Sequence, residues 1–347
     1  MLEKNQTQDR HPRVLTGLAS FASAALLMGL GLPQSAPAQI PDRDLRASSV
    51  SGHTAKSIDL NGIPARYYEA GSGEPLILIH GGRRSVFNSA NMWTKNISGL
   101  AEHFHVYALD RLGYGLSGMR ADGDFRYAAE VEFLDDFIEA MGHDRVHLAG
   151  NSSGGAVVLE YASAHPEKVG TLTVVSVGPQ TAQNDFYGRP KGEVMREACG
   201  AVPGQVGWEC WMSAMTHPQG TFDEAHWESS RSMMSGPDRQ RIAEAQLTAP
   251  TEAPDYWVKR RAEWRAGGVH GLPILWVCGS HDVLDWGAED ENASLEGCVA
   301  FSHTLGANNP NVKTIIYNQA GHFAYREYPE LFNSDLISFI EYWNDQT

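Results

Sequence analysis

Short apolar runs alternate with segments of helical spacing along most of this chain, and this alternation constrains its fold more than any other feature. Strands that alternate with helices are typical of a mostly parallel sheet covered by helices. Eight runs are expected to be strands: residues 56–60, 65–70, 75–80, 105–110, 145–151, 171–177, 273–279 and 312–317. Four segments are expected to be helices: residues 90–102, 127–141, 155–164 and 329–343. We therefore predict an α/β fold whose mostly parallel eight-stranded sheet is flanked by helices and begins with a hairpin at Asn61-Gly62.

The alternation stops between the sixth and seventh expected strands. This span contains Trp208, Trp211, Trp227, Trp257 and Trp264, which are five of the nine tryptophans in the chain. A segment of about 90 residues is too long for a structureless loop in a compact domain. We therefore predict that residues 179–267 form a helical cap inserted after the sixth strand, and that residues 56–178 and 268–347 form the core. Most of these tryptophans are expected to build the core of the cap, and a minority to line a pocket that faces the sheet.

The N-terminal residues 1–38 have a different pattern. Arg10 and Arg13 precede a charge-free run of 19 residues, and the small-residue sequence Ala36-Pro37-Ala38 follows it. This order predicts a signal peptide cleaved after Ala38, a periplasmic or secreted protein, and no stable membrane insertion after cleavage. An uncleaved anchor is the alternative, because 19 apolar residues approach the length that spans a bilayer. The polar residues 39–55 are expected to be a flexible lead-in.

The charge balance argues against a nucleic acid partner. The chain has 27 Lys and Arg residues against 42 Asp and Glu residues, for a net charge of −15. Binding to DNA or RNA is driven by basic side chains that neutralise phosphates. We therefore expect no nucleic acid partner, and the chemical motifs of the chain lead us to expect a small-molecule substrate. The oligomeric state is left open by the sequence.

The four cysteines show neither C-x-x-C nor Cys/His ligand spacing, so no structural zinc site is indicated. Export would make disulfides admissible, although four cysteines allow three connectivities. We expect Cys199 and Cys210 to pair, because they are close in sequence and share a span with little sheet to stabilise it. Cys278 lies inside an apolar run, where a buried free cysteine acting as a small hydrophobic residue is the simpler interpretation.

The strongest chemical signal is the sequence Gly150-Asn151-Ser152-Ser153-Gly154-Gly155, a G-x-S-x-G motif where an apolar run meets a helical segment. A serine on a sharp turn from strand to helix is held in a strained backbone that projects its hydroxyl group into a site. Glycines beside it let the turn close. The motif alone is weak, and its position between strand and helix makes Ser152 the candidate nucleophile.

A serine hydroxyl group needs a histidine base and a carboxylate that orients it. Asp282 follows the seventh expected strand and His322 follows the eighth, in the chain order Ser, Asp, His that belongs to this kind of turn. A developing oxyanion also needs donors. Gly82 follows the apolar run that ends in His80-Gly81, and its backbone amide is expected to act together with the amide of Ser153.

A second glycine pattern, Gly113-Tyr114-Gly115-Leu116-Ser117-Gly118, matches the G-x-G-x-x-G of dinucleotide-binding folds. That motif must open directly into a helix, whose N-terminus faces the pyrophosphate. The residues that follow, 119–124, have the composition of a loop. We therefore interpret the pattern as a structural turn and infer no nicotinamide or flavin cofactor.

Taken together, these motifs resemble those of α/β-hydrolases of the capped type. The matching segments are His80-Gly81-Gly82, residues 110–117, residues 150–155, Gly279-Ser280-His281-Asp282 and Gly321-His322-Phe323. They extend from about residue 56 to the C-terminus, and the nucleophile, acid and base of the family fall on Ser152, Asp282 and His322. The Gly-Asn-Ser-x-Gly-Gly form is similar to that of hydrolases that cleave carbon–carbon bonds in ring-fission products, and it also occurs among esterases.

The resemblance implies an exported serine hydrolase that cleaves an ester of a small or medium organic acid through an acyl-enzyme, with no metal or organic cofactor. Serine as the nucleophile argues against epoxide hydrolase and dehalogenase chemistry. Three alternatives stay open: a carbon–carbon hydrolase of ring-fission ketoacids, a lactonase, and a ligand receptor on the same fold. Export counts against the first, because such catabolic steps usually follow uptake into the cytoplasm.

Overall fold

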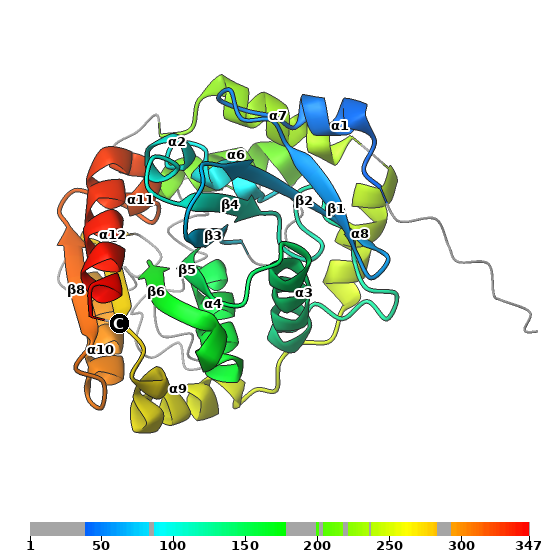
Figure 1. Ribbon diagram of the computed structural model, residues 1–347. Helices are drawn as coiled ribbons and strands as arrows, with labels where there is room; N and C mark the ends of the chain where they lie inside the picture. The colour runs from blue at the N-terminus through cyan, green and yellow to red at the C-terminus, as the bar shows by residue number, and fades with distance from the viewer. Residues whose placement is uncertain are drawn as a thin grey trace, which may run out of the picture. The chain divides into compact units, whose positions relative to one another are not determined.

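The computed structural model describes residues 39–82, 87–177, 199–200, 204–217, 221–235, 237–282 and 293–346. An eight-stranded sheet has the strand order β1-β2-β4-β3-β5-β6-β7-β8 (Figure 1). The strands are β1 (Lys56–Leu60), β2 (Ile63–Ala70), β3 (Pro75–Ile79), β4 (His105–Leu109), β5 (Val146–Asn151), β6 (Val169–Val175), β7 (Ile274–Gly279) and β8 (Val312–Tyr317). The pairs β1/β2 and β2/β4 are antiparallel, and the remaining pairs are parallel. The predicted sheet is therefore confirmed.

Helices connect these strands. They are α1 (Asp42–Ala47), α2 (Ile97–Leu100), α3 (Tyr127–Ala140), α4 (Ser153–Ala164), α6 (Gly204–Ala214), α7 (Glu224–Met234), α8 (Pro237–Thr248), α9 (Tyr256–Gly267), α10 (Ala293–Gly306), α11 (Ala324–Glu327) and α12 (Pro329–Asn344). No described helix is long and apolar enough to cross a membrane. The expected signal segment, residues 1–38, lies outside the described residues.

The hairpin between β1 and β2 turns at the expected place. Leu60 pairs with Ile63, and the two residues between them, Asn61 and Gly62, have φ angles of 54° and 89°. Positive φ at both central positions is the geometry of a two-residue hairpin turn, which asparagine and glycine accept at low cost. The predicted hairpin is confirmed.

The helix expected at residues 90–102 is divided into a 3₁₀ turn, Ala90–Trp93, and the short helix α2. The guanidinium group of Arg326 donates to the backbone oxygens of Asn91 and Met92, both at 3.1 Å. A continuous α-helix would use these carbonyl oxygens for its own hydrogen bonds. Their engagement by Arg326 explains the break. The structure also contains α10, which the sequence pattern did not predict.

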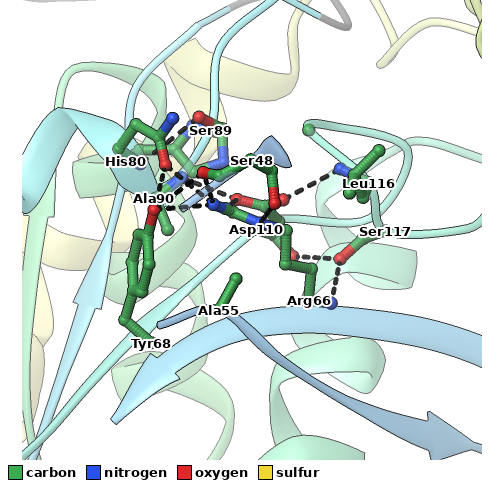
Figure 2. A network of polar contacts seen from close by, with 12 residues as sticks. Ser48, Ala55, Arg66, Tyr68, His80, Ser89, Ala90, Asp110, Leu116 and Ser117 are labelled. Carbon is green, nitrogen blue, oxygen red and sulfur yellow. Dashed lines mark hydrogen bonds and ion pairs between the residues drawn. The ribbon is translucent and has the colours of Figure 1, made fainter. Parts of the chain in front are cut away.

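Residues 39–55 are not the flexible lead-in that their polar composition predicts. Residues 42–47 form α1, and Ser48 directly after it is fully buried. Arg66 of β2 donates from Nε to Ser48 Oγ at 2.8 Å and from Nη2 to the Ser48 backbone oxygen at 2.6 Å (Figure 2). Ile40 and Val50 are buried as well. A buried guanidinium group needs acceptors, and this segment supplies them, which no local sequence pattern reveals.

Each face of the sheet carries its own hydrophobic cluster. Successive side chains of a strand point to opposite faces. Ile77 packs in the cluster that contains Phe137 of α3, whereas its neighbour Leu78 packs in the cluster that contains Phe332 and Leu336 of α12. Every residue of β5 and β6 is buried. The central strands are therefore covered on both sides and hold their carboxyl ends in fixed positions.

Helices α6 to α9 follow β6 in the chain, where the sequence predicts a helical cap. Their aromatic side chains do not form a separate core. Trp227 joins the cluster of α12 and Trp264 joins the cluster of α3, while Trp211 is 38% exposed. This helical segment is therefore packed onto the sheet clusters, and its role as a cap over the site remains a prediction.

Two disulfides are present. Cys199 bonds to Cys210, which confirms the expected pair, and Cys278 of β7 bonds to Cys298 of α10. The interpretation of Cys278 as a free buried cysteine is therefore wrong. Cys298 approaches it because α10, which the sequence pattern missed, packs against β7.

Candidate active site

Ser152 lies at the tight turn between β5 and α4, with φ 54° and ψ −126°. A positive φ is strained for a residue with a side chain, and such strain is typical of functional turns. Glycines make the turn possible. A Cβ atom on Gly150 would lie 2.4 Å from the backbone oxygen of Gly154, and one on Gly154 would lie 2.3 Å from that of His80. The local sequence therefore forces the sharp strand-to-helix turn that presents Ser152.

Asp282 and His322 meet beyond the ends of β7 and β8. His322 Nδ1 lies 2.7 Å from Asp282 Oδ2, and the two residues are 4% and 0% exposed. A carboxylate accepts from Nδ1–H, which fixes the imidazole tautomer and leaves Nε2 free to accept a proton. The pairing of these two residues was expected from their positions after neighbouring strands.

Asn151 ties the turn of Ser152 to the loop of His322. Its Nδ2 donates to the backbone oxygen of His322 at 3.1 Å and to that of Val175 at 3.3 Å. The hydrogen bond expected between Ser152 Oγ and His322 is not formed within the part of the chain that the structure describes. The structure thus joins His322 to Asp282 directly, and it joins the turn of Ser152 to the backbone of His322 through Asn151.

Gly82 and Ser153, the expected oxyanion donors, are in contact. Ser153 Oγ donates to the backbone oxygen of Gly82, which also accepts from Tyr114 Oη and Arg111 Nη1, both at 3.0 Å. Gly82 has a φ of 112°, which favours glycine. Gly81 also packs closely on the turn, since a Cβ atom there would lie 2.9 Å from Ser152 Cβ.

Arg111 supports the Gly82 side of the site through hydrogen bonds. Its guanidinium group binds both oxygens of Glu130 at 2.6 Å, and the two side chains are 3% and 6% exposed. Burial opposes the charge, but the attraction of Glu130 outweighs it and raises the pKa of Arg111. Burial and then Arg111 lower the pKa of His80 well below its ordinary value. Neutral His80 therefore accepts from Arg111 N through Nε2 at 3.1 Å and donates from Nδ1 to the Gly81 oxygen at 2.7 Å.

Glu327 supports the loop of His322 from the other side, and no sequence pattern predicted this role. Its carboxylate accepts from the backbone N–H groups of Gly321 at 2.6 Å, Phe323 at 3.2 Å and His217 at 3.3 Å. Burial raises the pKa of Glu327 to about 7, against the lowering effect of these three donors. A glutamate five residues after a histidine is too common a pattern to predict this role.

The helical segment also supports the backbone of His322. The N–H of His322 donates to the backbone oxygen of Met215 at 2.9 Å, just after α6. The backbone around His322 is therefore supported partly by Glu327 and partly by the segment 215–217.

The comparisons with known proteins identify the family of the chain. A family model for the alpha/beta hydrolase fold matches residues 74–329. The chain belongs to the α/β-hydrolase family. The resemblance inferred from its motifs is confirmed, and the match includes Ser152, Asp282 and His322 within its bounds.

Relatives of two activities are similar to this α/β-hydrolase. A 2-hydroxy-6-oxo-6-(2'-aminophenyl)hexa-2,4-dienoic acid hydrolase of Metapseudomonas resinovorans is 38% identical over 128 residues, which are 37% of this chain and 43% of that protein. Carboxylesterase YbfK of Bacillus subtilis is 28% identical over 265 residues, which are 76% of this chain and 79% of that one.

A solved structure of a serine hydrolase involved in carbazole degradation, the CarC enzyme, superimposes with a TM-score of 0.63. It is 23% identical, and the match covers 84% of this chain and 99% of that one. At this identity the likeness shows the shared fold alone.

Proposed function

We propose that this protein is an exported serine hydrolase that cleaves esters of small or medium organic acids through an acyl-enzyme. The observation that carries the proposal is the strained Ser152 turn, tied by Asn151 to the buried His322–Asp282 pair. A strained serine turn, a base at its side and a carboxylate on that base are the parts that acyl transfer requires.

In this proposal Ser152 Oγ attacks the carbonyl carbon while His322 Nε2 accepts its proton. His322 then gives the proton to the leaving alcohol, and Asp282 stabilises the imidazolium ion. The backbone amides of Gly82 and Ser153 donate to the tetrahedral oxyanion, and a donor of this kind changes the rate by about 10² to 10³. Water activated by His322 then releases the acid and restores Ser152.

Three observations support the ester as substrate and export as the location. The relative YbfK is a carboxylesterase, and the match covers 79% of its length. The disulfides Cys199–Cys210 and Cys278–Cys298 suit an oxidising compartment. The sequence of residues 10–38 provides the expected signal for export.

A carbon–carbon bond hydrolase is the second candidate, because the relative from Metapseudomonas resinovorans acts on a dienoic ketoacid. Such an enzyme would use the same three residues, but it must also bind an acidic dienol and assist its ketonisation. The lactonase and receptor hypotheses differ from the ester hydrolase only in substrate or in turnover.

A comparison of kcat/KM on short to medium nitrophenyl esters and on ring-fission ketoacids tests the choice, with Ser152→Ala as the blank. An ester hydrolase cleaves the esters with an initial burst as the acyl-enzyme accumulates. Efficient turnover of ketoacids with feeble turnover of every ester would replace the proposal with the carbon–carbon hydrolase. Cleavage of lactones alone would favour the lactonase, and binding without turnover would favour the receptor.

A further inference from the structure

A cavity of ≈ 530 Å³ lies away from Ser152, which is not among its lining residues. Its walls come from the segment 39–44, from Leu116 in the loop after β4, and from helices α7 and α8. Ile40, Leu116 and Met233 form an apolar cluster in this wall. One part of the lining is therefore apolar, while Gln39, Asp44, Ser232 and Asp238 belong to its polar part. The two parts come from elements far apart in the sequence.

Arg239 is the unusual group in this wall. The residue is 5% exposed, and its Nη1 donates to the backbone oxygens of Gly115 at 2.7 Å and Ser117 at 2.9 Å. Throughout the described ranges, no carboxylate lies within 4.0 Å of its nitrogens, and Nε and Nη2 have no hydrogen-bond partner. A buried guanidinium group without a counter-ion is costly, and it normally pairs with an anion.

The neighbouring carboxylate of Asp110 is already occupied. Its Oδ1 accepts from Arg66 Nη1 at 3.0 Å and from the Ala90 N–H at 2.7 Å, and its Oδ2 accepts from the Leu116 N–H at 2.9 Å (Figure 2). Asp110 therefore binds Arg66 directly and acts on Arg239 only through a longer-range attraction. Nε and Nη2 of Arg239 have no hydrogen-bond partner among the described residues. Burial lowers the pKa of Arg239 to about 10, as expected for a cation that lacks a close partner.

We propose that this cavity binds a small organic monocarboxylate, whose carboxylate group pairs with Arg239 and whose hydrocarbon chain lies against Ile40, Leu116 and Met233. A guanidinium group is suited to bidentate pairing with a planar carboxylate. The proposal is independent of the reaction at Ser152.

The charges at the rim of the cavity favour a monoanion. Arg43 Nε lies 3.4 Å from Asp44 Oδ1, and Arg241 Nε lies 3.8 Å from Asp238 Oδ1. Each exposed positive charge at the rim is therefore balanced by a neighbouring carboxylate. Arg239 is then the one positive charge left facing the cavity among the described lining residues. A dianion such as phosphate would carry one charge too many and would gain nothing from the apolar wall.

A ligand at Arg239 would also connect α8 to the loop 110–117. Tyr114 of that loop donates to the backbone oxygen of Gly82 beside Ser152. Occupancy of the cavity would therefore steady the helical segment against the side of the site where the oxyanion is expected to form.

Carbon-13 labelling of methionine methyl groups gives a local test. Hexanoate is titrated into the purified protein, and the Met233 resonance is identified by its loss in Met233→Leu. We expect a saturable shift of this resonance, with a dissociation constant on the order of 0.1 to 10 mM for so small a ligand. Arg239→Gln should weaken binding about tenfold or more, since it removes a charge-assisted pair, whereas Arg120→Gln, at a residue outside the lining of the cavity, should not.

Arg239→Gln also loses contacts to the loop, so Ser232→Phe, which fills the cavity and keeps the arginine, must abolish the same shift. No shift with hexanoate, or an unchanged affinity in Arg239→Gln, overturns the proposal. Equal binding of hexylamine would show an apolar cavity without anion selectivity, and a response to inorganic phosphate alone would show the wrong class of anion. Both results reject it, whatever the outcome at Ser152.

Discussion

The two sides of the candidate site are held in different ways. On the side of Gly82, a buried ion pair between Arg111 and Glu130 fixes the loop, and both partners belong to the core. On the side of His322, the support comes from Glu327 and from the segment after α6, which belongs to the helical insertion. In the first support, the attraction of Glu130 raises the pKa of Arg111. The support of His322 depends on Glu327, whose pKa is raised to about 7, and on the position of helices α6 to α9.

The largest expected effect is on the Gly82 side. Arg111→Met leaves Glu130 buried without a partner, and breaking a buried pair in this way costs about 3–5 kcal/mol of stability. Chemical denaturation measures the loss. Arg120→Gln, which breaks an exposed pair with Asp122, should cost less than about 1 kcal/mol. If the two variants lost similar amounts of stability, the buried pair would contribute no more to stability than the surface pair, and the comparison would be wrong.

The next largest effect is expected from a variant that disturbs the contact between the loop of His322 and the helical segment. A Cβ atom on Gly321 would lie 2.5 Å from the Met215 oxygen and 2.9 Å from the His217 nitrogen. Gly321→Ala should therefore displace the segment, lower kcat about tenfold and cost about 1–3 kcal/mol of stability. Gly267→Ala is the control, because nothing lies within 4 Å of a Cβ atom there. Unchanged kcat in Gly321→Ala would show that the segment does not support the base.

The smallest effect is the pH dependence due to Glu327. Its pKa is raised to about 7 in the folded protein, above an unfolded value of about 4.3. The folded state therefore binds this proton more tightly, and its contribution to stability is full below the unfolded pKa and is lost as the pH rises through about 7.

The stability of the wild type relative to Glu327→Gln should accordingly fall by about 1–3 kcal/mol between pH 5 and pH 8. Denaturation curves of both proteins across this range isolate the contribution of Glu327 from that of other titrating groups. A relative stability that rises with pH would mean that the three backbone donors outweigh burial and keep the carboxylate ionised.

The parts that the sequence predicted are those with a local signal. The strands were placed to within two residues because buried strands are short apolar runs, and Ser152, Asp282 and His322 follow strands whose ends meet at one edge of the sheet. The roles of Glu327 and Arg239 have no such signal. Each depends on what packs around one side chain, which only the folded chain determines.

The N-terminal segment shows the same limit. Its polar composition is typical of a flexible leader, yet Ser48 is buried because Arg66 needs acceptors. Likewise, α10 has small and apolar residues without a clear helical period, so the partner of Cys278 could not be anticipated. Long-range polar contacts and disulfides therefore account for the main differences between prediction and structure.

The most direct test of the central claim is covalent labelling with an alkyl fluorophosphonate, which reacts with activated serine hydroxyl groups. Peptide mass mapping of the labelled protein should locate one phosphonyl group per chain on Ser152. The label should be absent from Ser152→Ala, and it should form far more slowly in His322→Ala, which keeps the serine but lacks its base. Labelling at another residue, or full-rate labelling of Ser152 without His322, would contradict the account of Ser152 as a nucleophile activated by the His322–Asp282 pair.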